Sequence, residues 1–328
     1  KFVDRTFNAN TQRADEILKF IKDNYAKGIP QGVCFHFEIA GDILKESTME
    51  LLALMPRGLV QLEIGMQSFN EQTLEAINRK TDTGKLINNI KRLVGFGNMH
   101  IHIDLIAGLT GEDILSFERS FNIGYSLKSN MLQMGFLKLL YGADMRESPE
   151  KYPCEFMDEP PYEVISTPWL DAREIKMLKK CEDALERLFN SGRFLFTLDY
   201  LINEVGFTPF RLFNEFGNAV SGEKMSLKTY TKLIYDYFKP FCDAKLLRDK
   251  LVSDLLVSGS VDYIPDELKR YDPLYKKAKG CFKNSEIALL YSTEQVIAVQ
   301  RNGEKDFFGR YEYKITDFSQ CDTVGMEC

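Results

Sequence analysis

The sequence lacks several features that mark whole classes of protein. Its seven cysteines include no C-x2-C or C-x3-C pair, so the chain does not itself encode a zinc or iron-sulfur site built on closely spaced thiolates. No stretch approaches the roughly 18 consecutive apolar residues of a membrane-spanning helix. The 42 basic residues are outnumbered by 48 acidic ones, giving a net charge of −6. Because there is no basic stripe to neutralise phosphates, we expect neither nucleic acid nor a membrane as a partner.

What is present indicates a folded chain in a reducing compartment. The 24 phenylalanines and 15 tyrosines supply ample material for a core, which excludes disorder. An odd number of widely scattered cysteines is typical of reduced thiols, so we expect a cytoplasmic protein. The strand-like residues 1–3 run directly into a polar segment without an initiator methionine or leader, and we interpret this as a chain that begins within a fold.

The first half alternates between two periodicities. Asn10 and Asn70 are typical helix N-caps, while Pro56, Gly95 and Gly97 stop helices. Extended apolar segments lie between the helices, and we predict strands over residues 33–40, 59–68, 100–108 and 131–140. Strands separated by helices of roughly 10 to 15 residues favour right-handed βαβ units and a parallel sheet.

One face of each predicted strand is polar or small, because alternate residues of a strand share a face. A doubly wound sheet buries both faces and reads as continuous apolar runs. We therefore predict an α/β fold in which a partial (β/α) TIM-like barrel encloses a cavity with its polar face. Catalytic groups belong at the carboxyl ends of the strands, which selects Glu38, Gln67 and Asp104. The polar face consists of His36, Glu38, Glu63, Gly65, Gln67, His100, His102, Asp104, Gln133 and Gly135.

Five short motifs occur in order through the first half. They are FVDRTFN at residues 2–8, FEI at 37–39, IGMQSF at 64–69, NRKT at 78–81 and DLIAGLTGE at 104–112. Together they resemble the radical S-adenosylmethionine superfamily, particularly its members with a cobalamin-binding domain and, more distantly, oxygen-independent coproporphyrinogen dehydrogenase.

The resemblance implies a longer protein. In that superfamily a partial barrel carries a 4Fe-4S cluster on a C-x3-C-x2-C loop after its first strand, and the cluster reductively cleaves S-adenosylmethionine to a 5′-deoxyadenosyl radical. This chain contains no such loop, and the order of the motifs implies that residues 1–8 correspond to the second strand. The resemblance thus implies an upstream segment with the cluster ligands and, before it, a domain that binds cobalamin.

The resemblance also assigns cofactor-binding residues. Glu38 and Gln67 are expected to bond the ribose hydroxyls, and Ser68 belongs to the same motif as Gln67. Arg79 is expected to meet the methionine carboxylate, and Asp104 to help hold the nucleoside. Carboxylate and amide acceptors suit a diol, and a guanidinium suits a carboxylate. The residues that carry out the chemistry on a substrate are not identified.

Other interpretations of these residues stay open. Asp4 lies where many relatives have a Gly-Gly-Glu turn that binds the methionine amine, and we include it among the cofactor-binding residues. Glu38 and Glu63 are alternatively acids paired with a lysine or arginine inside the barrel. Arg79 is alternatively a solvated charge at a helix end, and Lys80 is equally able to serve in its place.

The polar residues inside the predicted barrel could either bind a metal or simply fill its interior. His100, His102 and Asp104 share one strand face, but three such residues splay over about 13 Å, whereas metal ligands converge at about 2 Å. Only His36 is left among the histidines to complete a site. We therefore predict no metal ligands. Cys34 and Cys181 we interpret as small core residues.

The second half predicts a different architecture. Five prolines between residues 149 and 168 favour extended, irregular backbone, and we place a boundary near residue 162, with a partial barrel over 1–162 and a smaller α+β domain of unknown role over 163–328. Apolar stripes predict helices near 175–188 and 227–237. Residues 296–300 and 311–315, with Asn302 and Gly303 between them, predict a hairpin.

The leading hypothesis is therefore that the chain is the C-terminal portion of a radical S-adenosylmethionine iron-sulfur enzyme of the cobalamin-associated class, inactive by itself. The sequence specifies no small-molecule substrate. One rival is a non-radical barrel lyase or hydrolase that uses Glu38 and Asp104 as acid and base. A second rival is a non-catalytic barrel module that binds a ligand or partner.

Overall fold

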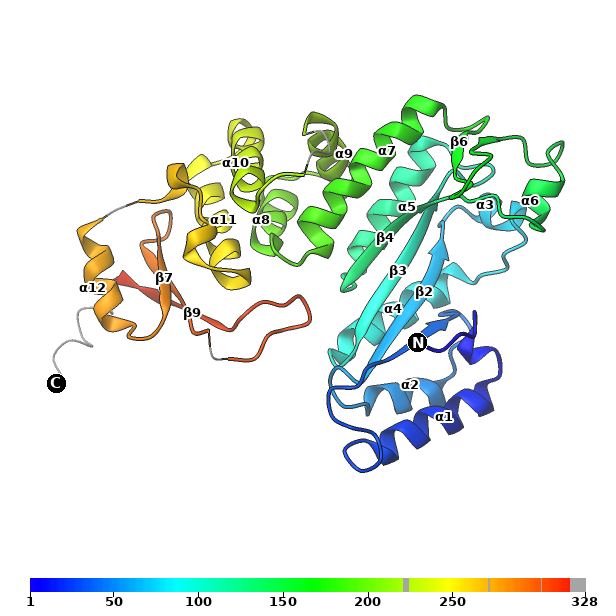
Figure 1. The fold of residues 1–328 in the computed structure, drawn as a ribbon, viewed down its shortest axis with the longest axis horizontal. Helices are drawn as coiled ribbons and strands as arrows, with labels where there is room; N and C mark the ends of the chain where they lie inside the picture. The colour runs from blue at the N-terminus through cyan, green and yellow to red at the C-terminus, as the bar shows by residue number, and fades with distance from the viewer. Residues whose placement is uncertain (221–223, 271, 302, 319–328) are drawn as a thin grey trace. The chain divides into compact units, whose positions relative to one another are not determined.

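The chain forms two compact units in the computed structural model, which describes residues 1–220, 224–270, 272–301 and 303–318. The units are Lys1–Glu182 and Asp183–Cys328, coloured from blue to green and from green to red in Figure 1. The division falls later than the boundary predicted near residue 162. The reason is that β6 (Val164–Ser166) returns to the first unit, where the Val164 amide donates to the Leu137 carbonyl at 2.9 Å and Lys179 pairs with Glu163.

The first unit is built on a four-stranded, all-parallel sheet. Its strands are β1 (Phe35–Ile39), β2 (Val60–Gln67), β3 (His100–Ala107) and β4 (Met131–Phe136), and they lie side by side in that order (Figure 1). Right-handed crossovers between strands in sequential order place every connecting helix on the same face. This is the arrangement of a partial (β/α) barrel, and the predicted α/β fold class is confirmed.

Several helices of this unit begin or end at the residues that the sequence indicates, although Gly95 lies inside a helix and the short helix Asp144–Glu147 was not predicted. Asn10 accepts the Arg13 amide, Asn70 accepts the amides of residues 72 and 73, Asp82 accepts the Lys85 amide, and Gly97 ends a helix in the left-handed conformation. The elements outside the sheet are η1 (Phe7–Ala9), α1 (Thr11–Asn24), α2 (Glu46–Ala53), α3 (Glu71–Ala76), α4 (Thr83–Phe96), α5 (Ile114–Ser126), α6 (Asp144–Glu147), β5 (Glu155–Phe156) and α7 (Ala172–Leu185).

The apolar face of the sheet forms the core beneath these helices. Phe37, Ile64, Ile103 and Leu132 are completely buried, as is Phe121 of α5. The side chains on the opposite face stay half-buried along most of the sheet. The alternation that predicted the strands therefore also separates a dry face from a polar one.

The beginning of the chain departs from the strand expected there. Residues 1–4 form no strand, and Phe2 makes one backbone hydrogen bond to the edge strand, from its amide to the His36 carbonyl at 3.0 Å. The Phe2 ring packs on Phe37 with 4.6 Å between centroids. The Asn8 side chain then exchanges two hydrogen bonds, of 2.8 and 2.9 Å, with the backbone of Ala40. The segment is thus held by its side chains rather than by a strand ladder.

The second unit is helical with one small antiparallel sheet. In its central helix α11 (Ala244–Ser258), every residue from Leu247 to Val257 except Lys250 is buried. The sheet has the order β7-β8-β9. The elements are η2 (Glu186–Asn190), α8 (Leu195–Asp199), η3 (Tyr200–Glu204), α9 (Pro209–Ala219), α10 (Leu227–Phe238), η4 (Lys239–Phe241), α11, η5 (Val261–Tyr263), η6 (Asp266–Leu268), α12 (Pro273–Cys281), β7 (Glu286–Leu290), β8 (Gln295–Val299) and β9 (Tyr313–Asp317).

The predicted hairpin is present as the antiparallel pair β8 and β9, and the predicted helices correspond to α7 with η2 and to α10. Strand β7 was not predicted. Asn302, Cys321 and Cys328 lie outside the described residues. Within the described part of the chain, no helix is both long enough and apolar enough to cross a membrane.

Candidate functional site

The polar face of the first unit's sheet is arranged in rows set by the strand register. His36 pairs with Gln61 and Gln61 with His100, in the row nearest the amino ends of the strands. In the next row Glu38 pairs with Glu63 and Glu63 with His102, and in the third Gly65 pairs with Asp104 and Asp104 with Gln133. Paired residues of parallel strands project to the same side. Predicted residues Glu38 and Asp104 therefore lie on one face, toward the carboxyl ends, and the Gln67 side chain reaches that face beside Gly65 although its backbone pairs with Leu105.

Glu63 is held in an ionic contact on this face. Its Oε2 lies 3.1 Å from Lys1 Nζ and 2.8 Å from His36 Nε2. Burial alone would raise the pKa of Glu63, but the Lys1 ammonium, with smaller contributions from His102 and His36, holds it below its usual range. Glu63 is thus the paired structural acid that the sequence allowed.

Asp104 is in the opposite electrostatic situation. Burial, reinforced by the nearby carboxylates of Glu63 and Glu38, raises the pKa of the Asp104 carboxyl to about 7. Its Oδ1 lies 3.2 Å from His102 Nε2, without the alignment of a hydrogen bond. Burial also lowers the pKa of His102, so this imidazole is neutral at pH 7. Asp104 can therefore hold or release a proton near neutrality.

Gly65 leaves room for the side chains at the end of β2. A Cβ at this position would lie 2.3 Å from Gln67 Nε2 and 3.3 Å from Arg79 Nη2, so any larger residue displaces Gln67. Gln67 itself has a φ of 66°, and a register shift separates it from Gly65. A left-handed non-glycine residue at a bulge is a strained conformation of the kind that accumulates at functional sites.

Arg79 reaches this same point from the segment after α3. Its Nη2 donates to the Gly65 carbonyl at 2.5 Å, whereas its Nε is buried without a hydrogen-bond partner in the described residues. Burial lowers the pKa of the Arg79 guanidinium, against the opposing effects of Asp42, Glu38 and Asp104. Lys80 is exposed, so between these two neighbouring cations Arg79 is the one placed over the sheet.

Two predicted residues are not brought to this face. Ser68 is buried on the other side of β2, where its hydroxyl donates to Glu112 Oε1 at 2.5 Å. Asp4 lies 3.7 Å from Arg13 of α1 in a partly exposed ion contact. The parity of the strand explains Ser68, because it follows Gln67 by one residue.

Glu112 is a buried acid in the motif at residues 104–112, and neither its burial nor a role was predicted from the sequence. It accepts from Ser68 and from Ser120, at 2.5 and 3.1 Å, and its Oε2 has no hydrogen-bond partner among the described residues. Burial raises the pKa of Glu112 to about 7 despite those two hydrogen bonds. The only signal in the sequence was its position just after Gly111, because its two serine partners lie in an earlier motif and on α5.

The cysteines and histidines do not form a metal site in the part of the chain that the structure describes, where no group of three or more potential ligands converges. Cys181 is buried, as expected for a core residue, but Cys34 is exposed, contrary to the prediction, because it precedes β1 rather than lying in it. All five described cysteines are free thiols.

The comparisons with known proteins give a family for the chain. Residues 150–319 match the family described as "Protein of unknown function (DUF4080)". That is more than half of the 328 residues. The chain belongs to the DUF4080 family. The matched region covers the end of the first unit and the described second unit, so the polar face of the sheet precedes the part of the chain that defines DUF4080. No curated protein matches the sequence.

Solved structures similar to this DUF4080 protein include the radical S-adenosylmethionine methyltransferase TsrM from Kitasatospora setae. With tryptophan and a cofactor analogue bound, TsrM shares 13% identity over 52% of this chain and 33% of its own, with a TM-score of 0.40. The structure of TsrM with cobalamin and a [4Fe-4S] cluster bound shares 16% identity over 49% of this chain and 34% of its own, with a TM-score of 0.39. Coproporphyrinogen III oxidase (HemN) from Escherichia coli, a radical SAM enzyme, shares 17% identity over 53% of this chain and 38% of its own, with a TM-score of 0.38. The chain thus spans little more than a third of the length of each.

Proposed function

We propose that the polar face of the first unit is the nucleoside half of an S-adenosylmethionine site in a radical enzyme. One observation carries the proposal. Over Gly65, where the Gln67 amide and the Arg79 guanidinium lie, Gln67 Oε1 and Arg79 Nε are both buried without a hydrogen-bond partner in the described residues. Buried polar groups are nearly always satisfied, so such atoms gathered at one point indicate a missing ligand.

The donors and acceptors at this point fit that cofactor. Glu38 carries an acceptor carboxylate for a diol, and no hydrogen bond or ion pair engages it within the described residues. Since β2 separates β1 from β3 and Asp104 lies one row further toward the carboxyl ends than Glu38, the backbones at these two residues are about 12 Å apart, with Gly65 beside Asp104 on β2. The two carboxyl groups are too far apart to contact each other directly, but a nucleoside lying between them can reach both. Arg79 supplies the cation for a carboxylate.

The work of the chain's own residues is binding and proton placement. Glu38 and Gln67 orient the hydroxyls, and Arg79 anchors the amino-acid end. Asp104, with a pKa of about 7, presents either a donor or an acceptor to the base. The cofactor supplies the radical chemistry when bound, and the protein supplies position and a partly dry surface.

The cluster does not fit the described residues, whose cysteines do not gather. We propose that its ligands lie in a preceding segment of a longer cytoplasmic protein of the cobalamin-associated class, with cobalamin bound by a further upstream domain. The order of the five motifs supports this, as does the absence of a C-x3-C-x2-C loop. The substrate is a small molecule that the face does not specify.

Cofactor binding tests the proposal without requiring turnover. S-adenosylmethionine should bind the purified protein saturably in equilibrium dialysis, and Glu38→Gln and Arg79→Met should each weaken binding about tenfold or more, because each removes a charge-assisted hydrogen bond. Glu50→Gln, an exposed acid on α2, is the matched control and should bind normally. Equal binding by all four proteins, or no saturable binding up to about 1 mM, contradicts the proposal.

The origin of the cluster ligands has its own test. Anaerobic reconstitution of these 328 residues with iron and sulfide should leave no cluster after desalting, because a catalytic cube needs three converging thiolates. About four irons per chain, with a visible charge-transfer band, would show instead that distant cysteines converge.

A second function is favoured by one observation. The pKa of Asp104 near 7 is also that of a general acid or base, as a non-radical lyase or hydrolase with Glu38 would need. The binding experiment separates the two, because such an enzyme has no reason to bind S-adenosylmethionine.

A further inference from the structure

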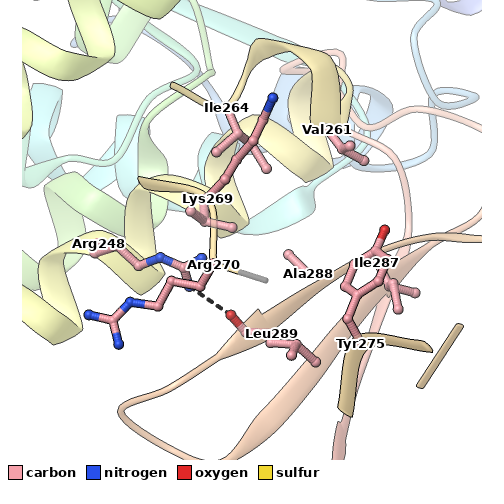
Figure 2. Close-up of a pocket in the computed structure, with 10 residues that line it drawn as sticks. Arg248, Val261, Ile264, Lys269, Arg270, Tyr275, Ile287, Ala288 and Leu289 are labelled. Carbon is pink, nitrogen blue, oxygen red and sulfur yellow. Dashed lines mark hydrogen bonds between the residues drawn. The ribbon is translucent and has the colours of Figure 1, made fainter. Parts of the chain in front are cut away.

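The second unit contains a pocket that is independent of the function proposed above. It lies between α11, the segment around η5 and η6, α12 and β7, and has a volume of about 190 Å³ (Figure 2). Its walls are mostly aliphatic. The apolar lining residues are Val252, Val261, Ile264, Ile287, Ala288 and Leu289.

The volume suits one ring with a small substituent. A dry protein cavity of about 150 Å³ accepts benzene, and this pocket is somewhat larger. Tyr275 of α12 adds an aromatic wall on the side where Ile287 lies (Figure 2). An apolar ligand body of about that size would be buried against carbon on several sides.

The charged groups of the pocket are all cations. Arg248, Lys269 and Arg270 line it, and none of its ten lining residues is acidic. Lys269 is paired with Asp266 at 2.8 Å, and Arg248 with Asp249 at 2.7 Å. Arg270 is exposed and has no ion pair with an acid in the described residues. The pocket therefore offers one uncompensated positive charge at an apolar hollow.

The Arg248 guanidinium is held in place by hydrogen bonds, and the exposed Arg270 lies against the same aromatic ring. Arg248 donates from Nε to the Leu268 carbonyl at 2.8 Å and from Nη1 to the Leu289 carbonyl at 2.7 Å, the bond drawn in Figure 2. The guanidinium carbons of Arg248 and Arg270 lie 5.2 and 5.0 Å from the centre of the Tyr291 ring. A cation that is already fixed, as Arg248 is, loses little freedom when an anion binds, and Arg270 keeps its guanidinium free for a carboxylate.

We propose that this pocket binds a small organic acid, with its ring-sized apolar body among the aliphatic walls and its carboxylate on Arg270. A guanidinium fork matches a carboxylate in shape as well as charge. The neutral walls disfavour a fully hydrated anion without an apolar part.

Phenylacetate is the probe, with phenylacetamide as its neutral counterpart and inorganic phosphate as an anion without an apolar body. Ligand-detected NMR and calorimetry on the full chain should show phenylacetate binding at least about tenfold more tightly than the amide, because the charged contact is lost. Arg270→Gln should weaken phenylacetate binding about tenfold. Lys276→Gln, which removes an equal charge from an exposed, non-lining position on α12, should not.

A second variant tests the walls. Ala288→Leu places extra carbon in the pocket and should abolish phenylacetate binding, whereas Arg270→Gln leaves the walls intact. The proposal is overturned if the acid and the amide bind equally, if Arg270→Gln binds like Lys276→Gln, if phosphate displaces phenylacetate at equal concentration, or if phenylacetate does not bind at about 1 mM.

Discussion

The two units both bury charged and polar side chains, but they treat them differently. In α11 the buried Arg248 and Asp249 bond each other, and the completely buried Asp254 accepts the amides of Phe196 and Thr197 at 2.9 and 2.8 Å. In the second unit, the described buried atoms without a hydrogen-bond partner lie on separate elements, in Thr197 of α8, Tyr291 after β7, Arg301 after β8 and Thr316 of β9. On the sheet of the first unit, by contrast, such atoms gather on one face. These atoms belong to His36, Gln67, Arg79, His100, His102 and Asp104.

The contrast separates structural polar groups from available ones. A buried group with partners contributes to stability, and removing it leaves those partners unsatisfied. A buried group without partners destabilises the fold unless something else binds it. Unusual pKa values alone do not make this distinction, because burial raises the pKa of Asp254 and of Asp104 alike to about 7. The presence or absence of hydrogen-bond partners does distinguish the two kinds of group.

The largest effect should come from breaking the paired group. Asp254→Ala removes the acceptor for two buried amides at the start of α8, so we expect the second unit to lose about 3 kcal/mol of stability. Hydrogen exchange of α8 and α11 measures the loss. Asp262→Ala, at an exposed acid of the same unit, is the control and should change little. Equal protection in both variants would mean that Asp254 is not structural.

Removing the charge of the unpaired Asp104 should raise the free energy of unfolding, by less than the loss expected for Asp254→Ala. Because the folded pKa of Asp104 is raised above its ordinary value, its contribution to stability is fully present below about pH 4 and is lost as the pH rises to about 7. Asp104→Asn cannot ionise and escapes this loss, so relative to the natural chain it should gain about 1–3 kcal/mol between those two pH values.

Urea unfolding monitored by Trp169 measures this difference, since the chain's single tryptophan lies in the first unit. Glu112, whose pKa is also raised to about 7, affects both proteins equally and cancels in the comparison. A difference between variant and natural chain that does not depend on pH would contradict the assignment of Asp104.

The smallest effect concerns Ser68, for which motif and geometry disagree. Ser68→Ala removes the bond to Glu112, so unfolding monitored by Trp169 should show a loss of about 1 kcal/mol. S-adenosylmethionine binding should stay unchanged, because the hydroxyl lies away from the polar face. Ser126→Ala, at an exposed serine on α5, is the control for stability. Weakened cofactor binding in Ser68→Ala alone would restore the role implied by the motif.

The fold of the first unit could be predicted because each strand buries one face only. The alternation in residues 59–68 yields β2 within a residue at each end, and side-chain caps such as Asn70 fix where helices begin. Helix α11 escaped prediction for the complementary reason. It is buried on every side, so it has no amphipathic period to recognise.

The candidate site could be predicted only as far as strand parity reaches. Parity and strand ends select Glu38, Gln67 and Asp104, but parity places only Glu38 and Asp104 on one face, and Gln67 joins them through a bulge that the pattern does not reveal. They do not reveal that Glu63 has Lys1 and His36 as partners, since those contacts join segments far apart in the sequence. The sequence pattern also does not distinguish Arg79 from Lys80. The backbone of the loop decides which of the two side chains points toward Gly65, and that conformation is not visible in the sequence.

All three histidines of these 328 residues lie on the polar face of one sheet. Their ring protons resonate apart from most other signals in a proton NMR spectrum, so the chain carries its own reporter of whatever occupies that face. Burial holds the pKa of His100 and of His102 below the ordinary value, and a ligand that changes their surroundings would move their titration curves. Screening compounds against this surface therefore needs neither an isotope label nor an assay of turnover.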